Sequence, residues 1–138
     1  MIVREIHYRL LTSPFGQHIR AINTLGTQSN KIAGAIQWLE SNYKNSVKVN
    51  ELASHVNMGV TAFYANFKQF TTLSPLQFQK KLRLIEAQRL MLIEGLDATR
   101  ACYDVGYESP NQFNREYKRM FGNSPMKDIK GILHQAGQ

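Results

Sequence analysis

The chain has 138 residues, enough for one compact core or for two small cores that share a connector, but too few for two ordinary domains. Hydrophobic residues make up 43% and charged residues 20% of it, a composition typical of globular proteins that fold in water. The single cysteine, Cys102, excludes an internal disulfide and the zinc sites that need paired thiols.

The chain is basic, with 17 Lys and Arg against 10 Asp and Glu, a formal net charge of +7 and a sequence pI near 9.7. Such an excess favours a polyanionic partner, either nucleic acid or an acidic membrane surface. No apolar run is long enough to cross a bilayer, and charged residues such as Arg4 and Glu5 interrupt the segment where a signal peptide keeps its apolar core. We therefore expect a cytoplasmic protein with no membrane association.

Two segments precede the most informative part of the chain. Residues 1–26 predict a short helix and a turn, because apolar residues recur every four positions until Pro14 and Gly16 interrupt them. From Ser29 to about Tyr43, apolar residues at helical spacing predict a core helix.

Residues 49–71 predict two helices joined by a tight turn. Asn50 is a suitable cap for the first helix, and Asn57 tolerates the left-handed backbone conformation that a tight turn needs. The second helix is expected to bury three aromatic side chains, Phe63, Phe67 and Phe70.

A long helix is predicted over residues 75–94. Ser74 can cap its first free amides, and Pro75 suits the first helical position, where no backbone hydrogen bond is lost. A helix of this length measures roughly 30 Å. A last short helix is expected from Pro125, followed by a frayed tail over residues 132–138.

The helical hairpin predicted over 49–71 recurs over 97–121, where Asp97 is the expected cap and Gly106 the expected turn. The matching residues of the two copies stand 50 apart: Phe63, Phe67, Lys68 and Ser74-Pro75 recur as Phe113, Tyr117, Lys118 and Ser124-Pro125. Before the turn the separation is 49, so the second copy has one extra residue inside its turn. Such repetition predicts duplicated structure, and each copy has the layout of a helix-turn-helix.

Helical geometry predicts an exposed polar face on the second helix of each copy. At 100° per residue, burial of the aromatic residues turns outward Thr61, Ala65 and Lys68 in the first copy and Asn111, Arg115, Lys118 and Arg119 in the second. Such groups can contact base edges in the major groove and backbone phosphates. One polar helix face is ordinarily a solvated surface, but two copies separated by roughly 30 Å would match successive major grooves, which lie roughly 34 Å apart.

One stretch resembles the AraC/XylS family of bacterial transcription regulators. It is Val105-Gly106-Tyr107-Glu108-Ser109-Pro110-Asn111-Gln112-Phe113, followed by Tyr117-Lys118, Phe121-Gly122 and Ser124-Pro125. The resemblance covers roughly Ser29 to Ile129 and implies an all-α, seven-helix domain over 27–131, with two helix-turn-helix subdomains joined by a linker helix. Residues 1–26 would then be the junction to an absent sensor or dimerisation domain; the alternative is a short regulator that acts alone, as a minority of the family does.

The resemblance also implies site residues. Base-reading positions map onto Thr61, Tyr64 and Ala65 in the first subdomain and onto Asn111, Gln112 and Arg115 in the second; the helical wheel agrees except that Tyr64 lies on its flank. We expect phosphate contacts from Lys68, Arg83, Lys118 and Arg119. Because the first helix offers small or apolar groups where relatives often carry larger polar ones, the second subdomain should supply more of the hydrogen-bonded base recognition.

The function implied is a nucleoid-associated transcriptional regulator, more commonly an activator, that binds double-stranded DNA and contacts RNA polymerase. This domain would be a monomer, with dimerisation left to the absent N-terminal domain. The alternative is a helical protein-interaction or dimerisation module whose basic surface meets an acidic protein. No recognisable catalytic arrangement is present, and the four histidines, His7, His18, His55 and His134, lack metal-ligand spacing. We therefore expect no enzyme activity, cofactor or metal.

Overall fold

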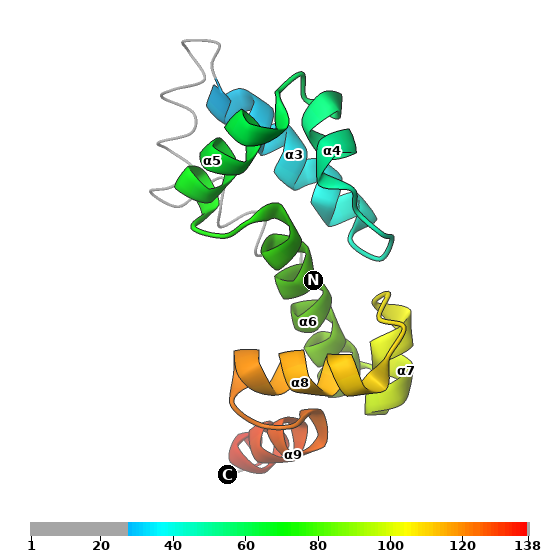
Figure 1. Ribbon diagram of the computed structural model, residues 1–138. Helices are drawn as coiled ribbons and strands as arrows, with labels where there is room; N and C mark the ends of the chain where they lie inside the picture. Colours follow the sequence, from blue (N-terminus) through cyan, green and yellow to red (C-terminus); the bar gives the residue numbers. More distant parts are fainter. Residues whose placement is uncertain (1–27, 138) are drawn as a thin grey trace. The chain divides into compact units, whose positions relative to one another are not determined.

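The computed structural model of the protein describes residues 28–137, so the helix and turn expected in residues 1–26 lie outside the described range. Within that range the chain forms seven helices and no strand, as expected from the sequence (Figure 1). The helices are α3 (Gln28–Asn42), α4 (Val49–His55), α5 (Val60–Thr71), α6 (Pro75–Ile93), α7 (Ala98–Asp104), α8 (Pro110–Phe121) and α9 (Pro125–Ala136). They divide into two compact units, with the boundary between Leu82 and Arg83 inside α6. No helix in residues 28–137 is both long and apolar enough to cross a membrane.

The first unit consists of α3, α4, α5 and the beginning of α6. α3 packs against both α4 and α5, because each helix carries apolar residues three and four positions apart that meet in one core. The ring of Phe67 on α5 meets that of Phe78 on α6 edge-on, with centroids 5.5 Å apart. Gln79 on α6 donates hydrogen bonds to the carbonyl oxygens of Tyr43 and Asn45, which follow α3, at 3.1 and 2.7 Å. These contacts assign the first turns of α6 to this unit.

In the second unit, α8 contacts α7 on one side and α9 on the other. Cys102 is fully buried on α7, so the expectation that it is a packed core residue is confirmed. The hydroxyl of Tyr117 on α8 donates to Asp128 on α9, and the same carboxylate oxygen accepts from Gln88 on α6 at 3.0 Å. Burial and the bond to Asp128 raise the pKa of the Tyr117 hydroxyl, which therefore remains a donor. One carboxylate thus joins three helices.

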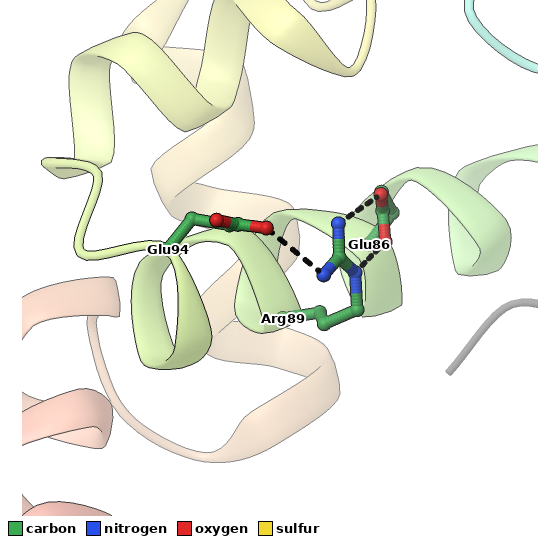
Figure 2. Close-up of polar contacts among 3 residues, drawn as sticks. All are labelled: Glu86, Arg89 and Glu94. Atoms are coloured by element: carbon green, nitrogen blue, oxygen red, sulfur yellow. Dashed lines mark hydrogen bonds and ion pairs between the residues drawn. The ribbon is translucent and has the colours of Figure 1, made fainter. Parts of the chain in front are cut away.

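The C-terminal half of α6 contains a buried ion pair (Figure 2). Arg89 and Glu86 are only 9% and 8% exposed, and the guanidinium forms two hydrogen bonds with the carboxylate, Nε to Oε1 at 2.6 Å and Nη2 to Oε2 at 3.0 Å. The Glu94 carboxylate lies 3.6 Å from Nη1. The hydrogen bond to Glu86 raises the pKa of Arg89. Such a forked contact satisfies both charges away from water.

The turns of both hairpins have the predicted left-handed conformation, with φ of 60° at Asn57 and 102° at Gly106. The predicted caps are confirmed at Asp97, whose carboxylate accepts from the Arg100 amide at 2.8 Å, and at Ser74, whose hydroxyl accepts from the Gln77 amide at 3.2 Å. Side-chain caps satisfy amides that the first helical turn leaves unpaired.

Two expectations about helix ends were wrong. Asn50 does not cap α4: the Leu52 amide already bonds to the Lys48 carbonyl at 3.0 Å, so Lys48 is the cap residue and Asn50 lies inside the first turn. The tail expected from residue 132 is helical as far as Ala136, where the Gly137 amide bonds to the Leu133 carbonyl at 3.0 Å. A single glycine at 131 therefore does not end α9.

Replacing Arg89 by methionine should cost about 3–5 kcal/mol of the free energy of unfolding, because it leaves the Glu86 carboxylate buried without its partner. Replacing both residues, Glu86→Leu with Arg89→Met, should recover most of that loss. Urea unfolding of the two variants measures the difference.

Arg100→Met provides the matched control. Arg100 forms an ion pair with Asp104 on the surface of α7, with side chains 70% and 39% exposed, and such pairs contribute about 0–1 kcal/mol. If Arg89→Met destabilised the protein no more than Arg100→Met does, the buried pair would not have the assigned role.

The C-terminal ends of α5 and α8 supply a second stability test. Both residues after the helix are left-handed, Thr72 with φ 66° and Gly122 with φ 89°, but only glycine adopts this conformation without a steric penalty. Thr72→Gly should stabilise the protein by about 0.5–1 kcal/mol, and Gly122→Thr should destabilise it by about 1 kcal/mol. A Cβ at Gly122 would meet nothing within 4 Å, so a clash of the Cβ adds nothing to the backbone cost that the thermal unfolding midpoints report. Equal midpoints for Gly122→Thr and the parent chain would contradict this account.

Candidate nucleic-acid interface

α5 has one buried face and one exposed face. Phe63, Phe67 and Phe70 fill the core of the first unit, and the aromatic rings of the first two have centroids 5.6 Å apart. The candidate side chains of this helix, Thr61, Tyr64, Ala65 and Lys68, are all exposed. Tyr64 is 39% exposed, so it can belong to the same surface as its neighbours although the wheel placed it on the flank.

α8 repeats this division in the second unit. Phe113 and Tyr117 are fully buried, with ring centroids 5.7 Å apart. Asn111, Arg115, Lys118 and Arg119 are exposed, as the helical wheel predicted, and Gln112 is half-buried. The helix begins with Pro110, and the hydroxyl of Ser109 accepts from the amide of Gln112 at 3.2 Å. A capped first turn orients the residues that follow it.

The exposed faces of α5 and α8 differ in chemistry. α5 offers the hydroxyl of Thr61, the phenol of Tyr64, the methyl of Ala65 and, nearer its C-terminal end, the exposed amide of Gln69, whereas the amide of Asn66 donates to the Ala62 carbonyl of its own helix at 2.8 Å. α8 offers the amide of Asn111 and the guanidinium of Arg115. Both helices thus present an amide that can form paired hydrogen bonds with a base, and the second helix adds a guanidinium that can do the same.

Beside the exposed face of α8 lies a polar cluster, which we define as Arg83, Tyr107, Gln112 and Glu116. The Glu116 carboxylate accepts two hydrogen bonds, one from the Tyr107 hydroxyl at 2.6 Å and one from the Gln112 amide nitrogen at 3.0 Å. Burial, followed by the hydrogen bond to Glu116, raises the pKa of the Tyr107 hydroxyl well above its usual value. The phenol is thus protonated and donates.

Arg83 is the fourth member of the polar cluster. Its guanidinium carbon lies 5.5 Å from the centre of the Tyr107 ring, within the range of a cation–π contact. Burial lowers the pKa of Arg83, while Tyr107, Glu116 and Glu108 act in the opposite direction. An arginine remains charged after such a shift. The residue predicted to contact phosphate thus packs on an aromatic ring beside α8.

Sequence reasoning did not single out Tyr107 or Glu116 as site residues. The contact between Glu116 and Gln112 could have been predicted, because the two residues are four positions apart and therefore adjacent on one helix face. The contact of Arg83 with Tyr107 joins residues 24 positions apart, and helical periodicity in the sequence cannot predict such a tertiary contact.

The structure brings six candidate residues together in the second unit, namely Asn111, Gln112, Arg115, Lys118 and Arg119 on α8 and Arg83 on α6. The other four, Thr61, Tyr64, Ala65 and Lys68, share α5 in the first unit. Residues 28–137 contain no group of three or more His, Cys, Asp or Glu side chains placed to hold a metal ion.

Comparison with known proteins identifies relatives of this chain among transcription regulators. A family model described as a helix-turn-helix domain matches residues 52–130. The transcriptional activator RhaS of Pectobacterium carotovorum is 25% identical over 111 residues, which cover 80% of this chain and 38% of RhaS. The regulator GbdR of Pseudomonas aeruginosa is 25% identical over 126 residues, covering 91% of this chain and 34% of GbdR. The chain thus spans between one third and two fifths of these relatives.

Solved structures show the same fold. The DNA-binding domain of AdpA, a global transcriptional factor crystallised with a target DNA, is 25% identical, has a TM-score of 0.70 and matches 78% of this chain and 97% of that one. An AraC family regulator from Rhodopseudomonas palustris, 22% identical, has a TM-score of 0.66 over 73% of this chain and 95% of that one. These relatives are transcription regulators and not enzymes. The chain belongs to the AraC/XylS family of transcriptional regulators and carries that family's helix-turn-helix DNA-binding domain.

Proposed function

We propose that this chain recognises a specific DNA sequence by inserting α5 and α8 into successive major grooves of one duplex. The observation that carries the proposal is that both helices bury their aromatic residues and expose the opposite face, the one that holds the candidate base-reading residues. The relative with 25% identity that was crystallised with a target DNA supports it. α6, with 19 residues, is a helix of roughly 28 Å, comparable with the groove repeat of roughly 34 Å.

Base recognition is proposed to depend mainly on α8. Arg115 suits the two acceptors of guanine, and the amides of Asn111 and Gln112 suit the edge of adenine. On α5, Thr61 and Ala65 offer methyl groups that suit the thymine methyl, and Tyr64 adds a hydroxyl and a ring face. The second unit then supplies most hydrogen-bonded discrimination, and the first supplies apolar contacts.

Phosphate contacts are proposed for four basic side chains, Lys68, Arg83, Lys118 and Arg119. Lys68, Lys118 and Arg119 lie in the last turns of their helices, where a charged side chain can reach past the groove edge to the backbone. Such contacts position the helices without reading the sequence.

We further propose that the protein activates transcription and contacts RNA polymerase. Relatives that share its domain are named transcriptional activators. The domain, over residues 27–131, would act on DNA as a monomer in the nucleoid of the bacterial cytoplasm. Any dimerisation would then depend on segments outside this domain.

Selection of bound duplexes from a random pool tests sequence-specific binding and defines the preferred site. With that site in hand, Arg115→Ala should reduce the ratio of affinities for the preferred and a scrambled duplex by about 5- to 150-fold, the range expected for one paired contact with guanine. Thr61→Ala should reduce it less. The assignment would be wrong if Thr61→Ala abolished discrimination and Arg115→Ala left it unchanged.

Salt dependence separates DNA binding from association with an acidic protein. Contacts with about six to ten phosphates should cost roughly three to five decades of affinity between 50 and 200 mM salt. Lys118→Ala should weaken binding to preferred and scrambled duplexes alike and reduce the slope of log K against log salt by about 1. Lys130→Ala, at an exposed position on α9, is the matched control and should leave the slope as it is. A parent chain with a shallow slope and no duplex preference would favour the protein-interaction alternative.

A further inference from the structure

The polar cluster beside α8 holds one candidate base-reading side chain in a defined orientation. Gln112 has a carbonyl oxygen that accepts hydrogen bonds and an amide nitrogen that donates them, and rotation by half a turn exchanges the two. In the structure the nitrogen lies 3.0 Å from the Glu116 carboxylate. The orientation of this amide therefore depends on what Glu116 can accept or donate.

The chemistry of the partners determines that orientation. The Tyr107 hydroxyl is protonated and donates to one Glu116 oxygen at 2.6 Å, so Glu116 acts as the acceptor of that bond. An ionised carboxylate accepts hydrogen bonds and donates none. The second carboxylate oxygen of Glu116 can consequently accept a hydrogen bond only from the nitrogen of the Gln112 amide. The amide oxygen of Gln112 is then directed away from Glu116.

We propose that Glu116 is a positioning residue that makes Gln112 read a base carrying an amino group. With its oxygen directed away from Glu116, Gln112 accepts a hydrogen bond from the N6 amino group of adenine or the N4 amino group of cytosine in the major groove. Guanine and thymine present keto oxygens at the corresponding places, and these need a donor. This inference rests on the proposed function and extends it to the identity of one base.

The first unit offers an internal comparison. At the 50-residue separation of the repeat, Ala62 stands in the place of Gln112 and Asn66 in the place of Glu116. Asn66 donates to the Ala62 carbonyl of its own helix, and Ala62 has no amide to orient. The arrangement of a carboxylate that orients a base-reading amide belongs to the second unit alone.

The test is selection from a random duplex pool with the complete 138-residue chain and its variants. Gln112→Ala should erase the preference at one base position, and in the parent chain that position should favour adenine or cytosine over guanine or thymine by about tenfold. Glu116→Gln, which can donate as well as accept, lets the Gln112 amide rotate, and the preference at that same position should fall to about twofold or less. Glu116→Gln combined with Gln112→Ala should change that position no further than Gln112→Ala alone.

Two controls separate positioning from structural support. Tyr107→Phe removes the hydroxyl that donates to Glu116 but keeps the Glu116–Gln112 bond, so the base preference should survive, whereas a purely structural role predicts that it falls as in Glu116→Gln. Asn66→Ala should leave the position read by Gln112 unchanged. Thermal unfolding of each variant confirms that it is folded.

The outcomes also separate this inference from the proposed function. A parent chain without any duplex preference would overturn both. A parent chain with a defined site whose Gln112-dependent position favours guanine or thymine, or keeps its preference in Glu116→Gln, would overturn the positioning role alone.

Discussion

The packing of aromatic side chains along one face of α5 and of α8 is the interaction on which the rest of each unit depends. Phe63 and Phe67 in the first unit, and Phe113 and Tyr117 in the second, are buried completely and touch in pairs four residues apart. In each unit these rings pack together with a small set of buried aliphatic side chains, and each ring removes a large apolar area from water. Once these rings lie in the core, the opposite face of each helix must be exposed. The position of the proposed DNA-reading surface therefore follows from the packing of the core.

Much of this arrangement could be predicted from the sequence, because it depends on local signals. The caps at Ser74 and Asp97 and the turns at Asn57 and Gly106 depend on residues close together in the chain, and the 50-residue repeat shows that the same signals occur twice. Each acts through backbone geometry that a few neighbouring residues determine. The exposure of Arg115 and Asn111 likewise follows from helical periodicity.

The features that sequence reasoning missed are tertiary or depend on competing local bonds. The contact between Arg83 and Tyr107, and the convergence of Gln88 and Tyr117 on Asp128, join separate helices or loops and leave no periodic trace. The burial of Glu86 and Arg89 runs against the ordinary exposure of charged residues and becomes favourable only because the two form a forked pair. Asn50 has the chemistry of a cap, but the Lys48 carbonyl starts the helix earlier.

The junction at Asp128 has a consequence for where the domain can end. Because this carboxylate accepts from Tyr117 and Gln88, α9 supplies the polar partner for a phenol that is otherwise enclosed in the second unit. A chain cut after Phe121 would lose that partner together with the buried side chains of Pro125 and Ile129, and α8 would keep its contact with α7 but lose its contact with α9. The last helix, which carries none of the candidate base-reading residues, is thus needed for the second unit to fold completely.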